Sequence, residues 1–144
     1  MADEKSKVEV IYERLNGLRD IATKDMHIDR GNLETNFNSQ IKVTEWLNRR
    51  LEWQRVFNSL EAKRKEAWKN CYEYYRKDYN LKLNSAEEYR IMIETDPNYS
   101  NIMNESQAVK EVLNYIDTIV DALKARAWDV SNLAKWLMWT NGNQ

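Results

Sequence analysis

The most regular pattern of apolar residues lies toward the C-terminal end of the chain. There, apolar side chains recur at alternating steps of four and three, which is the spacing of a heptad seam. The seam comprises Val109, Leu113, Ile116, Val120, Leu123, Ala127, Val130, Ala134 and Leu137. Further apolar residues beside it, including Ile119 and Leu133, widen the stripe. The pattern predicts a helix over residues 104–138 that packs against several neighbours.

This predicted helix is long for the size of the chain. At about 1.5 Å per residue it would span about 50 Å, whereas a compact chain of this length is about 26 Å across. We therefore predict a homo-oligomer of more than two subunits, although packing on the chain's own helices is the alternative. The predicted oligomerisation residues are Val109, Leu113, Ile116, Val120, Leu123, Ala127, Val130 and Leu137.

Three further helices are predicted upstream. Residues 1–7 are polar and expected to be disordered, and Val8, Ile11, Leu15 and Leu18 then recur at helical spacing. Residues 30–79 contain no proline and one glycine near the start, so one long helix is predicted there. Residues 85–88 read Ser-Ala-Glu-Glu, a capping box that opens a short helix over 85–95. A polar loop is expected between this helix and the heptad helix.

The composition agrees with a helical protein. The 144 residues include only three glycines and one proline, so tight turns and hairpins should be few. We predict an all-α fold of long helices forming a single domain over residues 1–144. No apolar run reaches the roughly 20 residues that cross a bilayer, and the first residues lack a signal-peptide core. A cytoplasmic protein without membrane contacts is expected.

Charge is distributed unevenly along the chain. The net charge is −2 for residues 1–41, +5 for residues 42–77 and −4 for the remaining residues. A basic middle segment favours a polyanionic partner, but a solvated, salt-bridged helix face would give the same composition.

Residues that could support catalysis are scarce. Cys71 is the only cysteine and His27 the only histidine, so neither a disulfide nor an ordinary zinc site is expected. No phosphate-binding glycine loop, nucleophile elbow or histidine-based catalytic set is found. We predict a protein that is not an enzyme and has no metal or cofactor, with Cys71 as a small core or interface residue.

Basic and aromatic residues alternate within the predicted long helix. Proteins that hold single-stranded nucleic acid without reading its sequence need cations for the phosphates and flat rings on which bases stack. The candidate DNA-binding residues are Arg49, Arg50, Arg55, Lys63, Arg64, Lys65, Lys69, Tyr72, Tyr75, Arg76 and Lys77. Aromatic residues at helical spacing are also common in protein cores, so a purely structural reading stays open.

Several sequence blocks resemble the UvsY family of phage recombination mediator proteins, in matching order and spacing from about Leu18 to Leu133. The blocks are Asp25-Met-His-Ile-Asp29, Glu45-Trp-Leu-Asn-Arg49, Leu60-Glu-Ala-Lys-Arg-Lys65, Tyr72-Glu-Tyr-Tyr75 and Asp121-Ala-Leu-Lys-Ala-Arg126-Ala-Trp.

The resemblance implies a small, non-enzymatic protein of an infected bacterial host's cytoplasm. It would bind single-stranded DNA and form a ring through its C-terminal region. It would also contact the phage single-strand-binding protein and a RecA-like recombinase, and help the recombinase load onto covered DNA during recombination, replication and repair. A structural scaffold oligomer without DNA binding is the alternative.

One block departs from the family pattern. Where the family has an aliphatic residue followed by Lys-Ala-Arg, with the lysine and arginine implicated in DNA contact, this chain reads Trp68-Lys69-Asn70-Cys71. Lys69 therefore matches, whereas Cys71 stands where the family has arginine. Either Arg76 and Lys77 compensate one turn later, or the DNA surface lies elsewhere. No role is assigned to residues 1–17.

Overall fold

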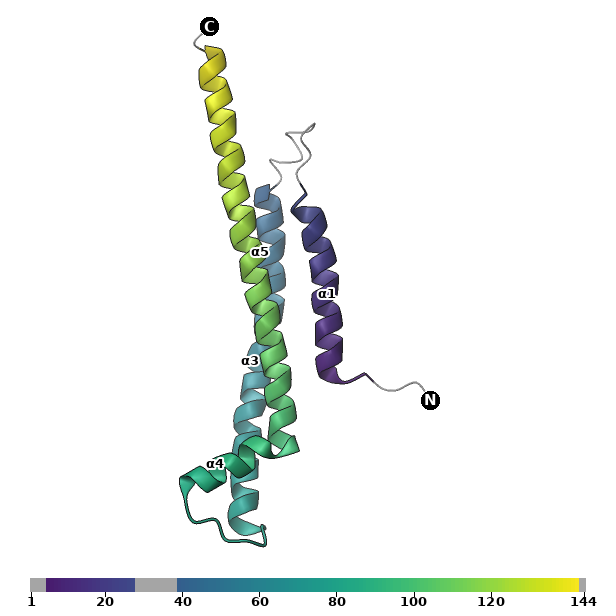
Figure 1. Cartoon of the computed structure of the whole chain (residues 1–144), viewed down its shortest axis with the longest axis vertical. Coiled ribbons are helices and arrows are strands. Elements are labelled where there is room, and N and C mark those ends of the chain that lie inside the picture. The colour runs from purple at the N-terminus through teal and green to yellow at the C-terminus, as the bar shows by residue number, and fades with distance from the viewer. Residues whose placement is uncertain (1–4, 28–38, 143–144) are drawn as a thin grey trace. The chain divides into compact units, whose positions relative to one another are not determined.

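The structure, a computed structural model, describes residues 5–27 and 39–142. Within these ranges it contains helices and short connections and no strand, so the predicted all-α fold is confirmed. The helices in Figure 1 are α1 (Lys7–Asp25), α3 (Ser39–Lys77), α4 (Ala86–Thr95) and α5 (Pro97–Gly142). None of the described helices combines the length and apolar character that crossing a bilayer requires.

Helix α1 buries the face that the sequence predicts, including Ile11, Leu15 and Leu18. Residues 1–7 are expected to be disordered, and residues 1–4 of this segment lie outside the described ranges. Residue 7 instead begins α1. The Ser6 hydroxyl accepts a hydrogen bond from the Glu9 amide at 3.1 Å, and the Glu9 carboxylate accepts one from the Ser6 amide at 3.3 Å. This reciprocal capping box satisfies amides that would otherwise lack partners, so the helix begins at Lys7.

Helix α3 runs without interruption from Ser39 to Lys77. The first nine residues of the helix predicted over 30–79 lie outside the described residues. At the other end, the amides of Asp78 and Tyr79 both donate to the Tyr74 carbonyl, at 2.9 and 3.0 Å, which closes the last turn.

The junction of α4 and α5 corrects one prediction. Ser85 caps α4 as the capping box predicts, and its hydroxyl accepts from the Glu88 amide at 3.2 Å. No polar loop follows, because α5 begins at Pro97 rather than near residue 104. Proline suits the first position of a helix, where an amide hydrogen has no partner within the helix. The Asp96 carboxylate accepts from the Asn98 amide at 2.9 Å, so one residue ends α4 and caps α5.

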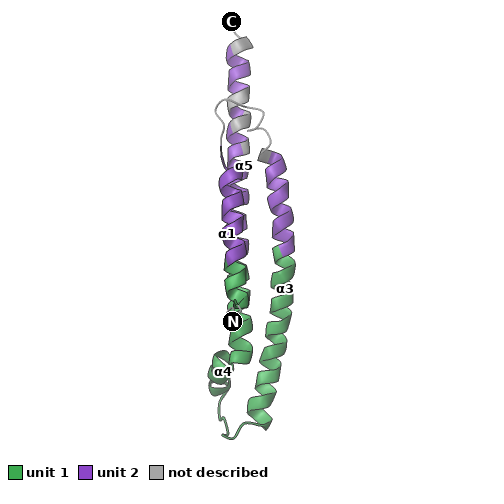
Figure 2. Cartoon of the chain, turned by 90° about the vertical axis from the view of Figure 1, so that its right-hand side faces the viewer, with its two compact units in different colours: residues 1–12, 53–111 green, residues 13–52, 112–144 purple. Residues whose placement is uncertain are grey.

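The chain divides into two compact units, coloured in Figure 2. Unit 1 comprises residues 1–12 and 53–111, and unit 2 comprises residues 13–52 and 112–144. Three helices contribute to both units.

Unit 1 has an aromatic core between the end of α3, α4 and the start of α5. Its buried members are Cys71, Tyr75, Ile93 and Tyr99, with partly buried rings such as that of Trp68 around them. The rings of Trp68 and Tyr99 meet edge to face, with centroids 5.4 Å apart.

Unit 2 has a predominantly aliphatic core. Leu15 and Leu18 of α1 and Ile116, Val120 and Leu123 of α5 are all buried. Trp46, on α3, is also fully buried. In Figure 1 the last turns of α5 project beyond the described ends of α1 and α3 in this unit.

Candidate nucleic-acid interface

The outward face of α3 in unit 1 carries most of the predicted DNA-binding cations. Arg55, Lys63, Lys65, Lys69, Arg76 and Lys77 are all exposed. Within the described ranges, none of these six residues forms a salt bridge. Their charges are therefore available to a ligand.

Four of the predicted residues form one line on this face. Lys65, Lys69, Tyr72 and Arg76 follow one another at steps of four, three and four, which places them on the same side of a helix. They cover about 16 Å along the helix axis. Tyr72 is 40% exposed, and its ring centroid lies 5.0 Å from that of Tyr89 on α4. The line thus combines three cations with a partly supported, accessible ring.

Tyr75, a predicted stacking residue, does not lie on this face. It is 8% exposed, and its hydroxyl donates a hydrogen bond to the Asp96 carboxylate at 2.7 Å. Burial first, and then the hydrogen bond to Asp96, raises the pKa of the Tyr75 hydroxyl to about 12. A buried ring cannot offer its face to a base, so Tyr75 is a core residue. Its neighbour Tyr74, 48% exposed, presents the accessible ring in this turn.

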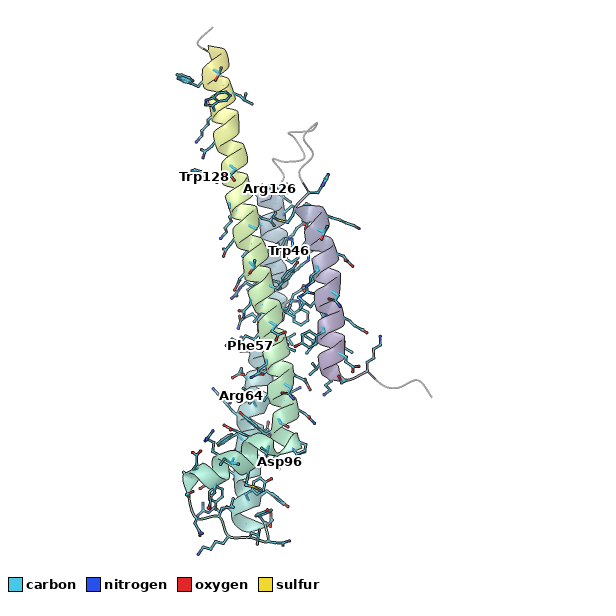
Figure 3. All side chains as sticks on the ribbon, in the orientation of Figure 1. Trp46, Phe57, Arg64, Asp96, Arg126 and Trp128 are labelled. Carbon is cyan, nitrogen blue, oxygen red and sulfur yellow. The ribbon has the colours of Figure 1, made fainter. Side chains whose placement is uncertain are left out.

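Arg64 is also occupied inside unit 1 (Figure 3). Its guanidinium donates to the Glu61 carboxylate at 2.8 Å and to the Tyr99 hydroxyl at 3.3 Å. Glu61 in turn accepts from the Ser106 hydroxyl of α5 at 2.8 Å. The hydrogen bond from Arg64 is the main cause that lowers the pKa of Glu61. Arg64 therefore joins α3 to α5.

Arg49 and Arg50 lie in unit 2 and have structural partners. The guanidinium of Arg49 lies 4.7 Å from the centre of the Trp46 ring, and its Nη1 is buried without a hydrogen-bond partner among the described residues. The Nε of Arg50 donates to Asp117 of α5 at 2.6 Å, which raises the pKa of Arg50. Of the predicted cations, Arg49, Arg50 and Arg64 are thus the ones already engaged by the fold.

Cys71 is buried in the aromatic core of unit 1, as the sequence predicts for a structural thiol. Burial, with a smaller contribution from Asp96, raises the pKa of the thiol. The position that departs from the family pattern therefore faces inward. Cys71 and Lys69 lie on opposite sides of α3. A side chain at position 71 therefore points into the core and does not join Lys69 on the outward face.

Three of the distinctive sequence blocks come together in unit 2 rather than on the cationic face. The Trp46 indole donates to the Asp25 carboxylate at 2.9 Å, and Lys42 lies 3.3 Å from the same side chain. From α5, Arg126 donates to the Asp25 carbonyl at 3.0 Å and to the His27 carbonyl at 3.4 Å. Figure 3 labels Trp46 and Arg126. No local sequence pattern indicates this pairing, because Asp25 and Arg126 are 101 positions apart.

The predicted oligomerisation residues separate into two groups. Val109, Leu113, Ile116, Val120 and Leu123 are at most 6% exposed within the chain itself, which leaves little surface for another copy. The side chains of Ala127 and Val130 lie outside the described residues, and Leu137 is 38% exposed. The role of this set in oligomerisation stays a prediction. Among the described side chains of α5, the exposed large apolar ones are Trp128, Trp136, Leu137, Met138 and Trp139.

Among the cavities beside α3 in unit 1, one of about 670 Å³ is lined by Lys63, the rings of Tyr74, Tyr75 and Tyr79, and Asp96 among others. We call it the tyrosine pocket. Another, of about 560 Å³, lies against the start of α1. In the described ranges, no cluster of three or more histidine, cysteine or acidic side chains is placed to hold a metal ion.

Solved structures share this arrangement of helices. The crystal structure of the bacteriophage T4 recombination mediator protein UvsY in lattice type IV matches with a TM-score of 0.76 and 22% identity, covering 88% of this chain and 98% of that one. Lattice type II of the same protein gives a TM-score of 0.77 and 19% identity, covering 88% of this chain and 97% of that one. A search of curated proteins found no match.

This chain therefore has an all-helical fold with the same arrangement of helices as these structures. The family model described as "Recombination, repair and ssDNA binding protein UvsY" matches residues 22–143. The chain belongs to this family, as its sequence blocks predict.

Proposed function

We propose that this protein is a recombination mediator that binds single-stranded DNA. In this proposal it promotes the loading of a RecA-like recombinase onto DNA covered by the phage single-strand-binding protein. It would act without enzymatic activity or cofactor, in the cytoplasm of the infected host, during homologous recombination and recombination-dependent replication and repair. Membership of the family and the cationic face of α3 support this function.

The line of Lys65, Lys69, Tyr72 and Arg76 carries the proposal. A protein that binds single-stranded DNA without sequence preference contacts the phosphates with cations and stacks the bases on exposed aromatic rings. Three of these residues supply exposed charge, and Tyr72 supplies an exposed ring that packs against the ring of Tyr89. Arg55 and Lys77 add further exposed cations on this face, and Lys63 lies beside the tyrosine pocket.

Loading of the recombinase would follow from differential affinity. A mediator that holds DNA in a conformation favouring the recombinase over the single-strand-binding protein shifts occupancy by linkage, so no nucleotide hydrolysis is needed.

Assembly would strengthen the modest DNA site of one subunit. Once one subunit is bound, binding by its neighbours becomes effectively intramolecular and avidity rises without any new interaction within a subunit. We propose a homo-oligomer of more than two subunits, in a ring, through the exposed end of α5. The large apolar side chains exposed there are those of Trp128, Trp136, Met138 and Trp139, which are 58–74% exposed. Exposed apolar side chains that gather in one region mark an interaction surface.

The test is DNA binding by the variant Lys65→Ala/Lys69→Ala/Arg76→Ala. Fluorescence anisotropy with a short single-stranded oligonucleotide, measured over a range of salt concentrations, should show weaker binding for all base compositions. The slope of log affinity against log salt should fall by about 0.7 for each phosphate that the variant no longer binds. Tyr72→Ala should lower affinity by about 1–3 kcal/mol with an unchanged slope, because stacking releases no counterions.

The matched control replaces three exposed basic residues outside the face, Lys24, Lys82 and Lys110, by alanine. This control should bind normally, and sedimentation should show the same assembly for all variants. Unchanged affinity and slope for the Lys65/Lys69/Arg76 variant would reject the face and favour the scaffold alternative.

A further inference from the structure

The end of α3 gathers three tyrosine rings at the tyrosine pocket. The amides of Asp78 and Tyr79 both donate to the Tyr74 carbonyl and close the last turn of the helix. The Tyr79 ring lies beside those of Tyr74 and Tyr75, with centroid distances of 6.3 and 5.0 Å. The rings of Tyr74 and Tyr75 are 5.1 Å apart, with their planes inclined at 75°. The three rings therefore form one cluster that lines the pocket.

Tyr74 is the ring of this cluster that a ligand can reach most easily. It is 48% exposed, whereas Tyr75 is 8% exposed and Tyr79 is partly buried. The two neighbouring rings restrict the rotation of the Tyr74 side chain. Little conformational freedom therefore remains to be lost when a flat molecule stacks on it. Tyr74 thus offers an accessible and preorganised aromatic surface.

Two amide side chains line the tyrosine pocket together with the rings. Asn70 of α3 and Asn98 of α5 are both exposed. In the described ranges, neither side chain forms a hydrogen bond. An amide side chain carries two N–H donors and one acceptor oxygen. Asn70 and Asn98 are therefore available to a ligand that has both donors and acceptors along its edge.

The charges that line the tyrosine pocket favour a neutral ligand. Lys63 and Glu66 are exposed, and neither forms a salt bridge with a described residue. Asp96, labelled in Figure 3, already accepts hydrogen bonds from the Tyr75 hydroxyl at 2.7 Å and the Asn98 amide at 2.9 Å. A phosphate in the pocket would lie near two carboxylates, and a basic side chain would lie near Lys63. Like charges at such distances repel each other.

A nucleobase has the shape and the polarity that this pocket fits. It is flat and neutral, it stacks on aromatic rings, and it carries hydrogen-bond donors and acceptors along its edge. The cavity of about 670 Å³ is within the range of about 300–1,000 Å³ that is typical of small-molecule sites. The pocket can therefore hold a base that is not stacked on its neighbours in the strand.

Exposed cations lie on both sides of the tyrosine pocket along α3. Lys63 precedes Tyr74 by three helical turns, and Lys77 follows it by three residues, so both lie on nearly the same side of the helix as Tyr74. The two lysines are about 21 Å apart along the helix axis. A strand with one base in the pocket would bring its neighbouring phosphates toward these cations. The pocket itself therefore does not need to be positive to bind a polyanion.

From this geometry we propose that the tyrosine pocket receives one unstacked base of single-stranded DNA, with Tyr74 as the stacking ring and Asn70 and Asn98 as hydrogen-bonding groups. The inference rests on the proposed function, since it requires a protein that binds single-stranded DNA. It adds a base site separate from Tyr72, which is two residues from Tyr74 and does not line the pocket. The two rings lie on different sides of α3.

The first test compares the full chain with Tyr74→Ala, using fluorescence anisotropy with a short oligothymidine. Binding should weaken about 5- to 150-fold for one lost stacking contact, and the salt slope should not change because stacking releases no counterions. Tyr74→Phe should bind normally, because it retains the ring. The matched control, Tyr12→Ala, removes a 39% exposed tyrosine of unit 1 that lies outside the pocket, and should leave binding unchanged.

A second pair of variants tests the pocket without altering its rings. Asn70→Leu replaces an amide that lines the pocket by an apolar group of similar size, and should weaken binding about 2- to 10-fold through the lost hydrogen bond. Asn104→Leu makes the same change at an exposed position of unit 1 outside the pocket, and should bind normally. Both positions are exposed, and circular dichroism should show equal helix content for the two variants.

Photocrosslinking identifies the rings that contact bases. Ultraviolet light couples a 5-iododeoxyuridine in the oligonucleotide to an aromatic side chain in contact with it, with loss of the iodine. Tandem mass spectrometry should locate adducts on Tyr74 as well as on Tyr72. Adducts on Tyr72 alone would overturn the inference.

The outcomes separate this inference from the proposed function. If the triple variant of the outward face loses affinity while the two pocket variants bind normally, the pocket is rejected and the proposed function stands. If all of these variants bind normally, both fail. An equal loss in the two control variants would show a general effect and reject the pocket. If the pocket variants lose binding to a lysine-rich peptide but keep DNA binding, the pocket belongs to a protein partner and the inference is likewise overturned.

Discussion

The indole nitrogen of Trp46 donates a hydrogen bond to the Asp25 carboxylate at 2.9 Å and thereby joins α3 to α1 in unit 2. The Asp25 side chain is only 8% exposed, and Lys42 supplies a second partner at 3.3 Å. Arg126 of α5 reaches the backbone carbonyl of the same aspartate. Residues from three of the distinctive sequence blocks therefore stabilise the helix packing, and their pattern is not a DNA-binding motif.

Trp46→Phe should destabilise unit 2. It removes the donor to a buried carboxylate, at a cost of about 1–3 kcal/mol, and leaves a small cavity in addition. Urea unfolding followed by circular dichroism measures the free energy of unfolding. Leu51→Met, at a position 57% exposed on α3 of the same unit, is the control and should change little. Unaltered stability together with abolished DNA binding would contradict a structural role for Trp46.

Stability should fall at high pH because of Tyr75. Its pKa is raised from 10.0 to about 12 in the folded protein, so the unfolded chain loses this proton first as pH rises. The Tyr75 hydroxyl therefore makes its full contribution to the free energy of unfolding below pH 10. This contribution is lost between about pH 10 and 12, at up to about 1.4 kcal/mol per pH unit. Asp96, Cys71 and Tyr74 are the charged or titratable groups that act on it.

Tyr75→Phe should remove this part of the pH dependence. Urea unfolding of both proteins at several pH values from about 8 to 12 provides the measurement. The difference between their free energies of unfolding cancels the effects of the other tyrosines. One of these is Tyr12, whose pKa is raised mainly by a hydrogen bond with Glu111. Parallel curves for the two proteins would show that the Tyr75 hydroxyl does not couple to folding.

Acidic substitutions should have different effects in the buried part of α5 and at its exposed end. Ile116 is fully buried within unit 2, so Ile116→Asp buries an unpaired charge and should unfold the unit. Met138→Asp/Trp139→Asp changes two side chains that are 74% and 68% exposed, and should keep the helix content while lowering the mass of the assembly. Circular dichroism and sedimentation velocity distinguish the two results. A folded Ile116→Asp protein of lower mass would instead place the subunit interface at Ile116.

Cys71 should react slowly with alkylating reagents in the native protein. The thiol is 5% exposed and its pKa is raised, so both access and thiolate concentration are low. Iodoacetamide labelling followed by mass spectrometry should be at least about 100-fold slower than in urea-unfolded protein, and Cys71→Ser should keep DNA binding. Rapid native labelling would show that the aromatic core of unit 1 opens readily.

The sequence by itself determined the helices, because their signals are local. Apolar spacing indicates α1, α3 and α5, and the Ser85 capping box locates the start of α4. The equivalent box at Ser6 and Glu9 is also present in the sequence, but the polar residues around it are equally typical of a disordered end. The polar residues after Pro97 likewise resemble a loop, and only the capping contact from Asp96 reveals the start of α5.

Only the tertiary structure decided which basic and aromatic residues are available to a ligand. Lys65 and Arg64 are neighbours in one basic run, yet Lys65 faces solvent while Arg64 is held by Glu61 and by Tyr99, 35 positions away. Tyr74 and Tyr75 are likewise adjacent, and only Tyr75 is directed to Asp96, 21 positions away. Helical periodicity gives the face on which a side chain lies, but burial and pairing depend on helices that are distant in sequence and meet only when the chain folds.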